Sequence, residues 1–214
     1  MKTKIVTTQP PQNQKITRPQ LLVLLRSGIA LEAYQFSKQI ALSWLAYYPG
    51  DLLVSRLFAK VLFLSGSYDQ SLLVLHDLIK TDPENPKNLE LLILVSKAAN
   101  IDLTERLSGS AFALGIEIGT HASIPTWAQY LRNARLAFGQ QEFSKADELI
   151  HHSLLGESPI ELIGITHLQI CTQNGLPQSA IQDLADQYHQ RWPTCLPISL
   201  MYAEALIEGS QSDN

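Results

Sequence analysis

Residues 52–83 read LLVSRLFAKVLFLSGSYDQSLLVLHDLIKTDP. Apolar residues recur along this stretch at intervals of three and four, the spacing that places them on one face of an α-helix. The pattern is interrupted at Gly66 and stops at Pro83, and both residue types break helices. The stretch therefore predicts two helices, over 52–65 and 69–81, which pack antiparallel because the turn between them is short.

The same helical spacing recurs through most of the 214-residue chain, whereas the alternation of apolar and polar residues that is typical of β-strands is nearly absent. We therefore predict an all-α protein. Asp51 precedes the helix over 52–65 and is placed to cap it. The expected helices cover residues 19–27, 31–47, 52–65, 69–81, 87–99, 103–117, 126–139, 142–154, 159–174, 177–191 and 196–208.

Prolines recur between these helices at a fixed interval. Pro49 and Pro83 are 34 residues apart, and Pro125, Pro159 and Pro193 are again separated by 34 each. Pro83 and Pro125 are 42 residues apart, which predicts one insertion between them. Two antiparallel helices cannot bury their apolar faces alone, so we expect neighbouring units to stack and complete a shared core.

At this point residues 52–83 resemble the tetratricopeptide repeat family. The resemblance is carried by small Ala59 on the first helix, Gly66 at the turn, Ser71 on the second helix and the closing Pro83. Small residues let two helices approach closely, and the proline stops the second helix before the next unit begins.

Two further units carry a weaker form of the pattern. The unit over 127–159 has Ala134 on its first helix and Ala146 on its second, and the unit over 161–193 has Gly175 at its turn. Over residues 19–208, the resemblance implies a right-handed superhelical solenoid of antiparallel helix pairs, with about five repeats plus a terminal helix. We expect residues 1–18 to form a disordered tail and residues 209–214 a flexible one.

Two units depart from the family pattern. The first unit has Gly28 where an aromatic or a large apolar residue is usual. The unit from Pro86 to Gly119 lacks a clear turn glycine and carries Gly109 and Gly115 in its second helix, which we expect to be kinked or frayed. The insertion is expected just after this unit, near residues 119–124.

In this family the first helix of each unit lines a concave groove that binds peptides, which implies a protein-binding scaffold. Several of the corresponding residues are basic, although the whole chain has a net charge of −4. An acidic or C-terminal peptide is therefore the expected partner. The alternative is that these side chains are only solvated helix faces. The candidate groove residues are Arg56, Lys60, Phe63, Lys97, Arg132, Arg135, Phe138, Gln169 and Tyr202.

The last predicted helix, over 196–208, is rather apolar for a terminal helix, with Ile198, Leu200, Met201 and Leu206. Such a helix is either a terminal cap of the array or the start of a continuation in a longer protein, and its apolar character favours a continuation or a contact in a homodimer. The alternative function is accordingly a self-associating assembly or sensory module of a larger regulatory protein.

Catalytic, nucleotide-binding and metalloprotease motifs do not occur in the sequence, so we expect no enzyme and no cofactor. His167 and Cys171 have a spacing that suits a metal, with His151 and His152 one helix earlier. Further ligands at a recognisable spacing are not evident, so the sequence predicts no metal site. We expect these residues to be buried core residues and solvated histidines.

The acidic net charge gives no reason to expect a nucleic-acid partner. Apolar runs such as 21–25 and 91–95 are too short to span a bilayer, so we expect no membrane partner and a soluble protein. The two cysteines, Cys171 and Cys195, are expected to be reduced, buried thiols, which suggests a cytoplasmic location.

Overall fold

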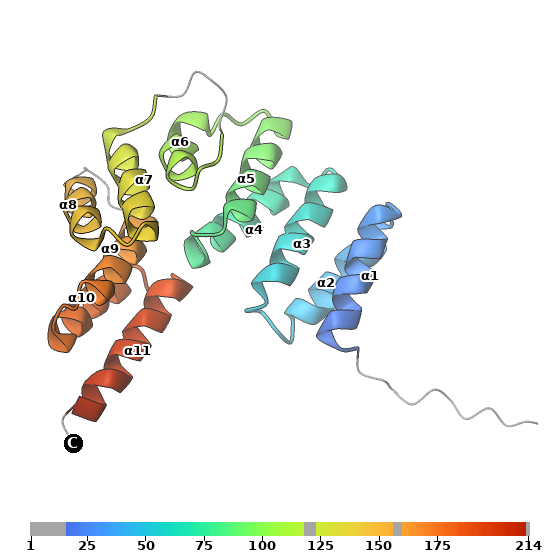
Figure 1. Ribbon diagram of the computed structural model, residues 1–214. Helices are drawn as coiled ribbons and strands as arrows, with labels where there is room; N and C mark the ends of the chain where they lie inside the picture. The colour runs from blue at the N-terminus through green and yellow to red at the C-terminus, as the bar shows by residue number, and fades with distance from the viewer. Residues whose placement is uncertain (1–15, 118–122, 156–159, 213–214) are drawn as a thin grey trace, which may run out of the picture.

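The computed structural model describes residues 16–117, 123–155 and 160–212. Within these ranges the regular secondary structure is entirely α-helical, as predicted. The helices follow one another along an arch (Figure 1). The helices are α1 (Arg18–Ala30), α2 (Tyr34–Leu45), α3 (Leu52–Leu64), α4 (Tyr68–Thr81), α5 (Pro86–Ala98), α6 (Thr104–Ala113), α7 (Thr126–Gly139), α8 (Phe143–Leu154), α9 (Glu161–Gln173), α10 (Gln178–Arg191) and α11 (Leu196–Ser212).

The 34-residue period also appears in the backbone conformation. The turn after α1, α3, α5, α7 and α9 contains one residue with a left-handed φ: Glu32, Gly66, Asn100, Gln141 and Gly175 respectively. Consecutive members of this series are 34 residues apart except Asn100 and Gln141, which are 41 apart. A left-handed residue commonly ends a helix and turns the chain into the next one. The period and its single interruption therefore describe the helix pairs themselves.

Consecutive helices pack against each other along the whole described chain. Contacts that skip one helix join α1 to α3, α3 to α5, α7 to α9 and α9 to α11. The odd-numbered helices therefore lie side by side on each flank of the interruption, where they form a layer that the even-numbered helices back.

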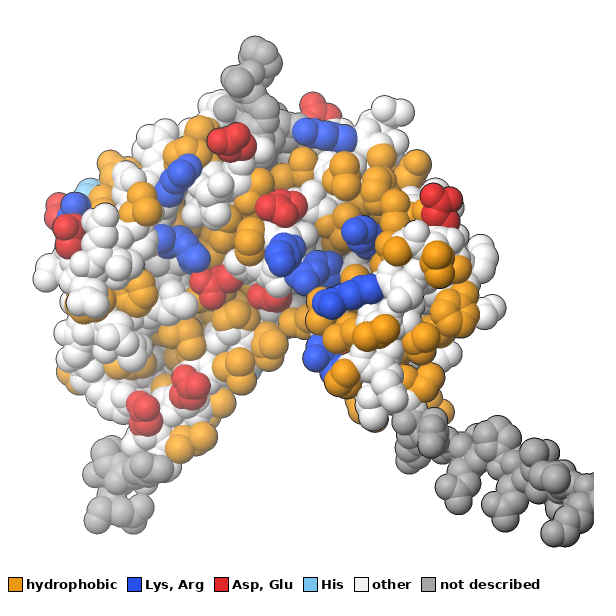
Figure 2. Space-filling view, turned by 45° about the vertical axis from the view of Figure 1, so that its right-hand side comes forward, with side chains coloured by type: hydrophobic (Ala, Val, Ile, Leu, Met, Phe, Trp, Pro, Cys, Tyr) orange, Lys and Arg blue, Asp and Glu red, His pale blue; other side chains and the backbone are white. Residues whose placement is uncertain are grey.

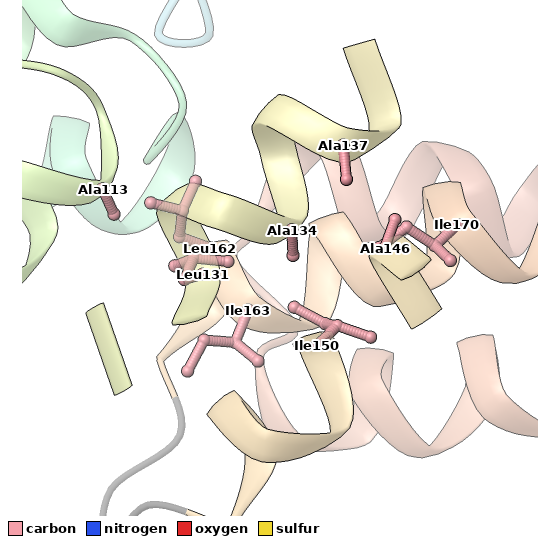
Figure 3. Close-up of a cluster of buried hydrophobic side chains, with 9 residues drawn as sticks. All are labelled: Ala113, Leu131, Ala134, Ala137, Ala146, Ile150, Leu162, Ile163 and Ile170. Atoms are coloured by element: carbon pink, nitrogen blue, oxygen red, sulfur yellow. The ribbon is translucent and has the colours of Figure 1, made fainter. Parts of the chain in front are cut away.

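Buried side chains form four overlapping clusters, which lie between α1 and α3, α3 and α6, α6 and α9, and α9 and α11. Figure 3 shows the third of them. Leu114, directly after α6, packs against both the second and the third cluster. Helix α9 buries nine of its 13 residues, since it contributes to both the third cluster and the fourth. The second and third clusters therefore meet at Leu114, just before the interruption.

Asp51 joins the first three helices. Its carboxylate accepts hydrogen bonds from Arg18 Nε at 2.7 Å, Trp44 Nε1 at 3.1 Å and the backbone N–H of Val54 at 3.3 Å. The last of these confirms the predicted cap of α3. The hydrogen bond from Arg18 is the main cause that lowers the pKa of the Asp51 carboxyl.

Three glycines lie where a neighbouring side chain leaves little room for a Cβ atom. A Cβ at Gly28 would meet Ser37 of α2, and a Cβ at Gly109 would meet the Trp127 ring of α7. A Cβ at Gly164 of α9 would lie 2.6 Å from Cζ3 of Trp192. The glycine that departs from the family pattern at position 28 therefore has a packing reason.

Several predicted boundaries differ from the structure. Helix α6 ends at Ala113 and not at residue 117, because Gly115 adopts a φ of +75° and Ile116 N–H closes back onto Ala111 C=O at 2.8 Å. Helix α11 continues four residues past the predicted end at 208, where Gly209 packs against Gln182 of α10.

The predicted N-terminal tail ends within the described region, since Arg18 already belongs to α1. Residues 1–15 of that tail lie outside the described residues. The same holds for residues 118–122, which contain most of the segment where we expected the insertion.

The close approach at Gly164 predicts a selective cost of one added methyl group. Gly164→Ala should lower the free energy of unfolding by roughly 1–3 kcal/mol, because the α9 backbone or the Trp192 ring must move. Gly139→Ala is the matched control, since a Cβ there meets nothing within 4 Å. Denaturant unfolding of both variants measures the difference, and equal effects would contradict the close packing.

Candidate functional site

All nine predicted groove residues lie on odd-numbered helices. Helix α3 carries three of them, α5 one, α7 three, α9 one and α11 one. They therefore belong to the layer in which α1, α3 and α5 contact in series, as do α7, α9 and α11. Figure 2 shows Lys and Arg side chains gathered above the opening of the arch, with acidic and apolar side chains beside them.

The basic residues among the nine candidates fall into two groups. Lys60 and Lys97 are exposed, and neither has an ion-pair partner within the described ranges. Arg56 is half-buried and donates from Nη1 to Asn85 Oδ1 at 3.2 Å. The guanidinium of Arg132 lies 4.5 Å from the centre of the Phe112 ring. Only the two lysines of this set present their charge without such a partner.

Arg135 is engaged inside the protein. Its Nη1 donates to Glu84 Oε1 at 3.0 Å and to Thr166 Oγ1 at 3.1 Å, and the Arg135 and Glu84 side chains are 29% and 27% exposed. Thr166 is buried and donates its own proton to Leu162 C=O at 2.9 Å, so its oxygen is free to accept from the arginine. Arg135 therefore lies on an odd-numbered helix, as do the other candidates, but its charge is balanced by Glu84.

The aromatic candidates are partly used for packing. Phe63 is half-buried against the second core cluster, with its ring 6.0 Å from that of Tyr68. The Tyr202 ring stacks on His189 of α10 at 5.1 Å. A hydrogen bond with Asp186 raises the pKa of Tyr202. These rings therefore shape the surface of the layer while being held by their neighbours.

A cavity of about 340 Å³ lies among α9, α10 and α11, at the end of α7. Phe138 and Gln169, two of the predicted residues, line it together with Met201, Glu204 and Glu208. The two glutamates give this end of the layer an acidic character, opposite to that of the exposed lysines on α3 and α5. Sequence reasoning missed the two glutamates and Glu84, since their neighbours lie on helices distant in sequence.

Comparisons with protein families, with curated proteins and with solved structures find no match for this chain. Among the helices of the described ranges, none has both the length and the apolar character that crossing a membrane requires.

Proposed function

We propose that this chain is a protein–protein interaction scaffold that holds a peptide or a partner domain against the layer of odd-numbered helices. One observation carries the proposal: all nine candidate residues lie on helices that contact one another in series on each flank of the interruption. Such a layer offers a long, preformed surface, which suits the recognition of an extended or helical segment.

The proposed architecture is a tetratricopeptide-like, right-handed solenoid. Its support is the 34-residue spacing of the left-handed turn residues and the pairing of each odd-numbered helix with the next even-numbered one. Buried small residues at the helix crossings fit the same pattern, since Ala59, Ala134 and Ala146 are fully buried and Ser71 Oγ donates to Ala59 C=O at 2.8 Å.

The charges of the layer suggest the kind of partner. Exposed Lys60 and Lys97 favour acidic groups near α3 and α5, whereas Glu204 and Glu208 favour basic or amide groups at the cavity beside α11. A segment with an acidic part and a polar or basic part would thus bind in one direction. Arg135 contributes little to this selectivity, because Glu84 balances its charge.

Selection from a displayed peptide library tests the proposal. We expect the wild-type protein to enrich peptides with acidic residues, and the double variant Lys60→Glu, Lys97→Glu to bind them more weakly by on the order of 1–3 kcal/mol. The matched control is Lys38→Glu, Lys80→Glu, which makes the same charge change on α2 and α4. Equal losses in both double variants would reject the assignment of the binding surface.

Self-association is a second candidate function, and the surface of α11 favours it. Leu196, Leu200 and Ile207 are 43%, 54% and 58% exposed, and exposed Ala203 lies between them. Spacings of four, three and four place these side chains on one face of the helix. An exposed apolar stripe of this kind is suited to a second copy of the chain or to a further helix.

Sedimentation velocity at micromolar concentrations tests this second candidate. We expect the wild type to form dimers, and Leu200→Glu with Ile207→Glu to sediment as a monomer because charged side chains then occupy the stripe. Leu73→Glu serves as the control, since Leu73 is 69% exposed on α4. A wild-type protein that stays monomeric would exclude self-association through α11.

A further inference from the structure

Two helices bring together three side chains that bind metals. Asp147 lies on α8, and His167 and Cys171 lie four residues apart on one face of α9. One ligand atom from each of the three lies within 4.8 Å of the others. The sequence showed the spacing of the histidine and the cysteine, but the packing of α8 on α9 was needed to place the carboxylate beside them.

A fourth side chain completes a second pair with the same spacing. His151 follows Asp147 by four residues on α8. Its Nδ1 lies 2.8 Å from the Asp147 carbonyl oxygen and 3.8 Å from Asp147 Oδ1, which leaves Nε2 as its ligand atom. The His151 ring meets the His167 ring edge-on, with 5.3 Å between centres. Two pairs of ligand-type residues, one pair on each helix, therefore face each other across the contact between α8 and α9.

The surroundings of the cluster also suit a metal site. The Tyr188 hydroxyl of α10 lies 2.7 Å from His167 Nδ1 and fixes the orientation of the ring, as partners behind metal ligands commonly do. His167 and Cys171 are buried, whereas the side chains of Asp147 and His151 are 36% and 61% exposed, so an ion can enter from solvent.

We propose that Asp147, His151, His167 and Cys171 form a zinc-binding site that clamps α8 to α9. One thiolate, two imidazoles and a carboxylate suit Zn²⁺, whereas Mg²⁺ and Ca²⁺ prefer oxygen ligands only. Tetrahedral zinc with bonds of about 2.0–2.3 Å holds its ligand atoms about 3.3–3.8 Å apart. The three grouped atoms must therefore approach by only about 1 Å, a movement within reach of side-chain rotation, while the cysteine thiol loses its proton to the solvent.

This site would act on the array independently of the peptide-binding layer. Helix α8 closes one helix pair and α9 opens the next, so bound zinc would fasten two successive units together. Because the ion binds the folded arrangement of two helices, it should raise the stability of the whole protein.

The experiment uses the full chain without a histidine tag, kept reduced by a phosphine and stripped of metal. We expect calorimetry to show one equivalent of Zn²⁺ bound, with a rise in Tm that Mg²⁺ does not produce. Co²⁺ should give the visible bands of a tetrahedral site and the near-ultraviolet band of a sulfur ligand. Absence of stoichiometric Zn²⁺ binding would overturn the proposal.

Three variants locate the ion. Cys171→Ser should remove the sulfur band of bound Co²⁺ and weaken zinc binding at least about tenfold. Cys195→Ser, which removes the other buried thiol, should leave the sulfur band and the zinc affinity unchanged. The Asp147 side chain is partly exposed, so the Asp147→Asn variant should stay folded, with the circular dichroism of the wild type. Its affinity for zinc should nevertheless fall at least about tenfold. Wild-type affinity in a folded Asp147→Asn or Cys171→Ser protein would place the metal elsewhere and reject the site.

Discussion

The guanidinium of Arg135 joins parts of the chain that the repeat alone would leave apart. Glu84 lies just before α5, so the hydrogen bond from Arg135 to Glu84 crosses the position where the 34-residue period is broken, while the bond to Thr166 joins α7 to α9. Leu114 makes the corresponding apolar contact, since it packs against the core clusters on both sides. These contacts join the helix pairs before and after the interruption, together with the packing of α6 against α5 and α7.

Helix positions could be predicted because they depend on local spacing. Apolar periodicity and the prolines located the helix pairs, and Asp51 was recognised as a cap from its position alone. The end of α6 was missed, since a glycine within a helical pattern is tolerated until its φ becomes positive, as at Gly115. Gly28 looked like a defect in the repeat because the sequence does not show that Ser37 lies against it.

The candidate sites could be predicted only in part, because their chemistry depends on contacts between distant residues. All nine candidate residues lie on odd-numbered helices, yet the partner of Arg135 lies 51 residues away and leaves no local pattern. Likewise, His167 and Cys171 share a helix face that the sequence shows, whereas Asp147 joins them only through the packing of α8 on α9. The exposed lysines Lys60 and Lys97 and the proposed zinc ligands are different residues, so variants can remove either set of side chains and keep the other.

Pulsed electron paramagnetic resonance can test most directly whether Arg135 holds together the helices before and after the interruption, by measuring a distance between α4 and α8. Spin labels at Leu73→Cys of α4 and Glu148→Cys of α8 sit on exposed positions, while both native thiols are buried. We predict one narrow distance distribution for the wild type. The distribution should broaden when Arg135→Leu removes the contact with Glu84. It should stay narrow when Lys145→Leu removes the exposed ion pair with Glu142. A distribution that is broad from the start, or that Arg135→Leu leaves unchanged, would contradict the role of Arg135.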